Sequence, residues 1–81
     1  MKARVFVPRA VEDILAELAE AERETIIGKL RLLEKFPRMY PIPARCRFRR
    51  HRRFLGRDWA VYYRVVGNTV YVRGLWPARI P

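Results

Sequence analysis

The sequence is poor in the residues that build disulfides and metal sites: its 81 residues include one cysteine, Cys46, and one histidine, His51. A lone cysteine cannot form an internal disulfide, so no oxidising compartment is implied and we expect a cytoplasmic protein. Cys46 has no second cysteine or histidine beside it, so we expect no metal ion and no other cofactor.

Long apolar stretches are also missing. The N-terminal run Val5-Phe6-Val7 is flanked by charges, and no long apolar segment follows it. Signal peptides and membrane-spanning helices both need such a segment. We therefore expect a soluble protein that does not contact a membrane.

The second half of the chain has almost no acidic residues. From Pro37 to Pro81 it holds eleven arginines, no lysine and one acid, Asp58, whereas residues 1–36 hold seven bases and seven acids. The second half thus carries the whole formal net charge of +10. Clustered charge of one sign repels itself unless an anion is close, so we expect nucleic acid or an acidic protein as the partner. A merely solvated basic surface is the alternative.

The first half predicts a short strand and two helices, and we assign residues 1–81 to a single domain. Residues 2–7 favour a strand that ends at Pro8, whose fixed φ suits the first position of a helix. Apolar residues then recur at helical spacing in two series: Val11, Ile14, Leu15 and Leu18, then Ile26, Ile27, Leu30, Leu33 and Phe36. The pattern predicts a helical hairpin whose first helix ends near Ala21, with a bend at about residues 20–24.

The rest of the chain favours strands. Residues 36–43 contain three prolines and predict a connection over the surface. Residues 45–54 predict an extended basic segment, and residues 58–66 alternate as a strand does. A Gly-Asn pair separates this strand from residues 70–73, as in an antiparallel hairpin. We therefore expect an α+β fold: an N-terminal strand, an αα-hairpin and a small antiparallel sheet.

Alternation within the last hairpin separates two faces of the sheet, because successive strand side chains point to opposite sides. One face is apolar and predicts the core: Trp59, Val61, Tyr63, Val65, Val70 and Val72. The opposite face would expose Tyr62, Arg64, Tyr71 and Arg73. Aromatic rings stack on unpaired bases and arginine binds phosphate, so this face suits single-stranded RNA. Simple cross-strand pairing of the two tyrosines is the alternative.

The segment before this hairpin is a second candidate binding surface. Its basic residues are Arg45, Arg47, Arg49, Arg50, Arg52, Arg53 and Arg57. As one unbroken strand the segment would turn Arg50 and Arg52 towards its phenylalanine side, where an unpaired charge is costly to bury. A bulge or bend near residues 50–52 would release them. Either arrangement predicts a dense basic patch beside the hairpin.

The order of these elements resembles the RelE/ParE superfamily of bacterial toxins. The resemblance is carried by Phe54-Leu55-Gly56-Arg57-Asp58-Trp59-Ala60-Val61-Tyr62-Tyr63-Arg64-Val65, by Asn68-Thr69-Val70-Tyr71-Val72 and by the basic position Arg79. It implies the toxin of a type II toxin–antitoxin system, either bound to a cognate acidic antitoxin in a hetero-oligomer or forming a homodimer. Toxins of the RelE type cut ribosome-bound mRNA, whereas ParE-type relatives poison DNA gyrase.

The resemblance also implies candidate catalytic residues. RelE-type enzymes activate the ribose 2′-OH against the adjacent phosphate, which needs a base, positive charge and an acid. His51 is the side chain that exchanges a proton most easily, with Arg53 and Arg79 on the phosphate. Ala60 stands where the nuclease branch typically has arginine, and no tyrosine follows Arg79. The first hypothesis is a ribosome-dependent mRNA endoribonuclease that inhibits translation; a gyrase inhibitor and a non-catalytic module that binds RNA or protein are the alternatives.

Overall fold

The computed structural model describes residues 2–45 and 48–78. The elements follow in the order β1 (Arg4–Phe6), α1 (Arg9–Glu17), α2 (Glu20–Leu32), β2 (Arg52–Gly56), β3 (Trp59–Val66) and β4 (Thr69–Pro77). The four strands form one sheet in the order β1-β4-β3-β2. β2, β3 and β4 pair antiparallel, and β1 pairs parallel to β4. The predicted α+β fold is confirmed, and the sheet is mixed because the N-terminal strand joins it beside β4.

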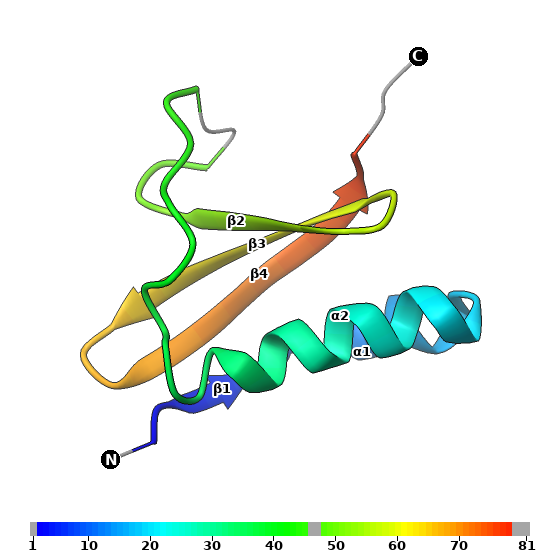
Figure 1. The fold of residues 1–81 in the computed structure, drawn as a ribbon, viewed down its shortest axis with the longest axis horizontal. Helices are drawn as coiled ribbons and strands as arrows, with labels where there is room; N and C mark the ends of the chain where they lie inside the picture. The colour runs from blue at the N-terminus through cyan, green and yellow to red at the C-terminus, as the bar shows by residue number, and fades with distance from the viewer. Residues whose placement is uncertain (1, 46–47, 79–81) are drawn as a thin grey trace.

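The two helices lie on one side of the sheet (Figure 1). α1 packs against β4, and α2 packs against β2. The predicted helical hairpin is confirmed, but the break between the helices falls earlier than expected, at Leu18 and Ala19, which are both extended. The Arg23 side chain stabilises the backbone at this break, because its guanidinium donates a hydrogen bond to the Leu18 carbonyl at 3.1 Å. Acidic residues in the first turn of α2 also favour a helix that begins there.

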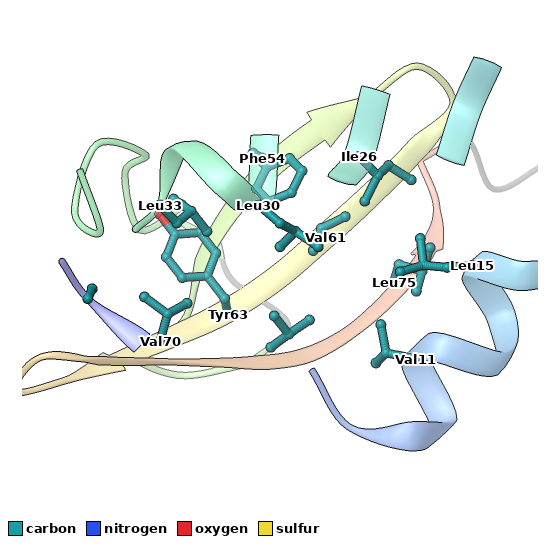
Figure 2. Close-up of a cluster of buried hydrophobic side chains, with 12 residues drawn as sticks. Val11, Leu15, Ile26, Leu30, Leu33, Phe54, Val61, Tyr63, Val70 and Leu75 are labelled. Carbon is teal, nitrogen blue, oxygen red and sulfur yellow. The ribbon is translucent and has the colours of Figure 1, made fainter. Parts of the chain in front are cut away.

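The core lies between the helices and the inner face of the sheet (Figure 2). Its largest fully buried side chains are Ile26, Leu33, Phe54, Val61, Tyr63 and Val70. The predicted core face of the last hairpin is confirmed, with Trp59 and Val65 packed at its margin. A Cβ at Gly56 would lie 2.7 Å from the side chain of Ile26, so glycine is what allows α2 to lie this close to β2.

A β-bulge interrupts the regular alternation of β4. Tyr62 pairs with Gly74, whereas the next residue of β3 pairs with Val72. Arg73 is therefore the extra residue of the bulge. The bulge shifts the alternation by one residue, so that Leu75 faces the core. It also lets β4 continue well beyond the predicted strand 70–73.

The predicted extended segment 45–54 is a strand only from Arg52 onwards. Arg50 has a φ of 61°, in the left-handed region, and the backbone N–H of His51 donates to the carbonyl of Phe48 at 3.3 Å. The unbroken strand is therefore wrong, and the bend considered as its alternative is present.

Arginine side chains hold the proline-containing connection between α2 and β2. This connection runs from α2 past the β3–β4 turn and on to β2 (Figure 1). The Nη1 atom of Arg52 donates to the carbonyl of Tyr40 at 2.7 Å and to that of Arg38 at 3.2 Å. Arg38 in turn donates to the carbonyl of Gly67 at 3.2 Å. These bonds fix residues 36–45, which form no helix or strand.

The helices of residues 2–45 and 48–78 are all too short and too polar to cross a membrane.

Candidate nucleic-acid interface

The outer face of the sheet, opposite the helices, carries three aromatic side chains in mutual contact. We call Phe48, Tyr62 and Trp76 the aromatic ridge. The centroid of the Phe48 ring lies 5.0 Å from that of Trp76 and 5.3 Å from that of Tyr62. The Tyr62 and Trp76 centroids are 5.6 Å apart, with the rings edge to face. Tyr62 is edge to face with both of the other rings, which is a favoured arrangement of aromatic pairs, so it holds the ridge together.

The bulge in β4 and the glycine within it explain the position of Trp76. The shifted alternation turns Trp76 to the outer face, opposite Ala60. A Cβ at Gly74 would lie only 2.7 Å from Cη2 of the indole, so the ring can cross the strand here only because residue 74 is glycine. The short side chain of Ala60 leaves room on the neighbouring strand.

The ridge changes the environment of Tyr62. This side chain is only 8% exposed, so the prediction that Tyr62 lies open on the outer face is wrong. Its cross-strand partner is Gly74, whereas Tyr71 pairs with Arg64. The alternative in which Tyr62 and Tyr71 pair with each other is therefore wrong as well. Tyr71 remains 46% exposed, as predicted.

A groove of about 400 Å³ lies on one side of the ridge, and we call it the His51 groove. Its lining residues are Phe6, Pro8, His51, Arg64, Val66, Tyr71, Val72 and Arg73. Arg73 also contacts the ridge, since its guanidinium carbon lies 5.0 Å from the centroid of the Phe48 ring. The centroid of the His51 ring lies 5.8 Å from the same ring. Phe48 thus brings an imidazole and a guanidinium together.

Hydrogen bonding determines which nitrogen of His51 is basic. The Nδ1 atom lies 2.7 Å from the carbonyl oxygen of Arg49. A carbonyl oxygen only accepts, so Nδ1 carries the proton of this bond and Nε2 is the basic nitrogen of the neutral ring. The backbone of its own loop therefore fixes the orientation of the His51 ring through Nδ1.

A second groove, of about 290 Å³, lies on the other side of the ridge, and we call it the Arg53 groove. Its lining residues are Arg45, Arg53, Leu55, Ala60, Tyr62, Trp76, Pro77 and Ala78. Arg53 is exposed and pairs with Tyr62 across β2 and β3. The sequence analysis predicts that Arg53 and His51 act together in catalysis, but in the structure the two residues line different grooves.

Both grooves are lined by arginines and by no acidic residue among those described. Within residues 2–45 and 48–78 the only ion pair joins Arg9 and Asp13 on α1, at 4.0 Å. No three His, Cys, Asp or Glu side chains in this part of the chain come together to hold a metal ion. The arginines of the outer face are therefore not neutralised by described carboxylates, and they can attract an anion.

The remaining predicted site residues lie apart from the grooves or outside the described part. Arg52 faces the proline-containing connection, where it donates to backbone carbonyls. Arg49 and Arg50 are exposed in the loop before β2, and Arg57 lies in the β2–β3 turn with a φ of 55°. Arg47 and Arg79 lie outside the described residues.

Sequence reasoning missed two contributors to this surface, Trp76 and Phe6. Strict alternation from Val72 would place Trp76 on the core side, and only the bulge reverses this. The run Gly74-Leu75-Trp76 is the one indication of the bulge in the sequence, because glycine within a strand often marks a bulge or a close approach of another group. Phe6 reaches the outer face because β1 pairs with β4, a long-range contact that local patterns do not reveal.

Comparison with known proteins identifies the family. The family model described as ParE toxin of type II toxin-antitoxin system, parDE, matches residues 5–80. The chain belongs to this family of toxins. A solved structure of the E. coli toxin RelE, a double arginine-to-alanine mutant in the free state, matches with a TM-score of 0.77 and 18% sequence identity. The match covers 98% of this chain and 86% of that one. No curated protein sequence matches.

Family membership places this toxin in the RelE/ParE superfamily and implies an antitoxin as its partner. The likeness to RelE at this identity shows a shared fold. The toxin therefore presents its basic outer face on the sheet of a RelE-like scaffold.

Proposed function

We propose that this toxin is an endoribonuclease that cleaves mRNA on the ribosome, with the chemistry in the His51 groove. One observation carries the proposal: an imidazole that is held at Nδ1 by the Arg49 carbonyl lines the same groove as Arg64 and Arg73. Phosphodiester cleavage by the neighbouring ribose needs a proton acceptor beside concentrated positive charge. Arginine supplies the charge but stays protonated, so His51 is the group that moves the proton.

The reaction can be written from these three side chains. Nε2 of His51 takes the proton of the ribose 2′-OH, and the 2′-oxygen bonds to the adjacent phosphorus. The guanidinium groups of Arg64 and Arg73 stabilise the charge that develops on the phosphate oxygens. The bond from phosphorus to the 5′-oxygen breaks, and this oxygen takes a proton from water. The hydroxide that remains takes the proton from the His51 imidazolium, which restores the neutral ring. The products are a 2′,3′-cyclic phosphate and a 5′-hydroxyl end.

Two observations bear on whether this toxin cleaves RNA or acts only by binding its target. The RelE-like fold supports an RNA target, while Ala60 leaves the Arg53 groove without an arginine at the position where the nuclease branch typically has one. In our proposal Arg64 and Arg73 provide the positive charge from the other side of the ridge. Inhibition of DNA gyrase is the second candidate, and it is favoured by the match to the ParE family model.

A translation extract that contains purified toxin and a defined mRNA tests the proposal. We expect new mRNA 5′ ends on translating ribosomes, and a loss of about 10²-fold or more in cleavage rate for His51→Ala. Arg31→Ala, which removes one charge from the helical side, is the matched control and should cleave like the original toxin. Intact transcripts on translating ribosomes would overturn the nuclease proposal. Inhibition of supercoiling by the same protein would then support the gyrase alternative.

A further inference from the structure

A second aromatic pair lies on the outer face, away from the aromatic ridge. Phe6 of β1 and Tyr71 of β4 are register partners on adjacent parallel strands, with ring centroids 6.1 Å apart. Their side chains are 55% and 46% exposed. Rings of this size are normally buried further, and an exposed aromatic pair of this kind is typical of a binding surface.

Arginines lie on both sides of this pair. Phe6 and Tyr71 together line the His51 groove, which also contains Arg64 and Arg73. The same two rings line another hollow, of about 280 Å³, on their other side, together with Arg4, Val5 and Thr69. Arg64 is the cross-strand partner of Tyr71, and Arg4 is exposed on β1. The two exposed rings are tilted by 58° to each other and have a guanidinium on either side, so one ring face can take a base while the arginines hold the phosphates before and after it.

We propose that Phe6 and Tyr71 form a nucleobase-binding subsite for single-stranded RNA, with flanking phosphates held by Arg64 and Arg4. This subsite extends the proposed RNA target and therefore rests on it. An acidic peptide would use the arginines but gain little from two exposed ring faces, whereas every base stacks on an aromatic ring. The exposed rings therefore favour RNA as the occupant.

The subsite lies on the His51 groove, the proposed reaction centre, and β4 connects it to the aromatic ridge. Tyr71, Arg73 and Trp76 all project to the outer face of one strand. Tyr71 and Trp76 are roughly 15 Å apart along the strand. RNA that reaches the ridge can thus continue past Arg73 to the Phe6–Tyr71 pair. The pair would position substrate without taking part in the chemical step.

Fluorescence anisotropy with labelled RNA oligonucleotides measures the subsite directly, without ribosomes. All proteins carry His51→Ala so that the RNA stays intact. We expect Tyr71→Ala and Phe6→Ala each to weaken binding of a uridine nonanucleotide by roughly 5- to 150-fold. Tyr71→Phe keeps the ring and should bind normally, as should Arg31→Ala. Arg64→Ala should also lower the slope of log affinity against log salt by about 0.7, the value for one lost phosphate contact on a single strand.

The outcomes separate this subsite from the proposed nuclease activity. Ring-dependent RNA binding by a toxin that cuts no mRNA would keep the subsite and remove the nuclease. Cleavage of mRNA together with equal RNA affinities for the ring variants and their parent would overturn the subsite alone. Tight binding of polyglutamate that depends on Phe6 and Tyr71, with no RNA binding, would also overturn it and assign the surface to an acidic protein.

Discussion

The guanidinium of Arg73 lies over the ring of Phe48, 5.0 Å from its centroid. Arg73 is the bulged residue of β4, and Phe48 belongs to the loop before β2, so this cation–π contact fastens the loop to the sheet. The loop is also the segment that carries His51. The position of the imidazole therefore depends on a contact between two residues that are 25 positions apart in the sequence.

Replacing Phe48 by alanine should loosen this arrangement. Phe48 is half-buried and contacts two ridge rings as well as His51 and Arg73. We expect Phe48→Ala to lower the free energy of unfolding in urea by about 2 kcal/mol and to shift the imidazole NMR signals of His51. Phe36→Ala, at a ring 55% exposed, should change stability by less than about 0.5 kcal/mol. Equal losses in the two variants would contradict the role of Phe48.

Gly74→Ala tests the close approach of Trp76 to the strand. The added Cβ would lie 2.7 Å from the indole, so the ring must move, and we expect destabilisation by about 1–3 kcal/mol. The indole N–H signal of Trp76 should shift in the NMR spectrum. Gly28→Ala is the matched control, because its Cβ would meet no atom within 4 Å beyond the neighbouring backbone of α2, and alanine should stabilise α2 by up to about 1 kcal/mol. An unmoved indole signal in Gly74→Ala would contradict the packing.

The sequence predicts the parts of the fold that depend on local periodicity. Alternation in β3 is sufficient to place Val61 and Tyr63 in the core, and helical spacing is sufficient to find both helices. The break between the two helices lies at Leu18, earlier than the pattern predicts. It is stabilised by the Arg23 side chain, which donates to the Leu18 carbonyl, and such a contact leaves no periodic pattern in the sequence.

The site was harder to predict than the fold because it depends on departures from periodicity. The left-handed φ of Arg50 takes His51 out of the strand, so that it no longer shares a groove with Arg53. The bulge at Arg73 likewise decides which residues of β4 face outwards. One extra residue in a strand turns every later side chain to the opposite face of the sheet. Predictions made from alternation are therefore reversed beyond such a point.

Arg52 and Arg53 are adjacent, and they should respond differently to substitution. Arg52 donates to the carbonyls of Tyr40 and Arg38, whereas Arg53 is exposed on the outer face. We expect Arg52→Gln to lower the free energy of unfolding by roughly 2 kcal/mol, because carbonyls that accept from a charged donor lose it. Proteolysis should then cut within residues 36–45. Arg53→Gln should leave both properties unchanged, and similar behaviour of the two variants would contradict the assigned contacts.

The buried hydroxyl of Tyr63 should make the stability of the toxin sensitive to alkaline pH. Among the described residues no group forms a hydrogen bond of good geometry with this hydroxyl, although the backbone of Tyr40 lies close enough to interact with it. Tyr63→Phe should therefore keep or raise stability at neutral pH, by up to about 1 kcal/mol. Burial raises the pKa of Tyr63 from 10.0 to about 12, an effect that the backbone of Tyr40 and the charge of Arg52 only partly offset. The folded state therefore keeps the phenol proton at a pH where the unfolded chain has lost it. This contribution is complete below pH 10 and declines between pH 10 and 12, by about 2–3 kcal/mol. Urea unfolding across this range should show a shallower decline for Tyr63→Phe, and equal slopes for the two proteins would contradict the burial of this phenol.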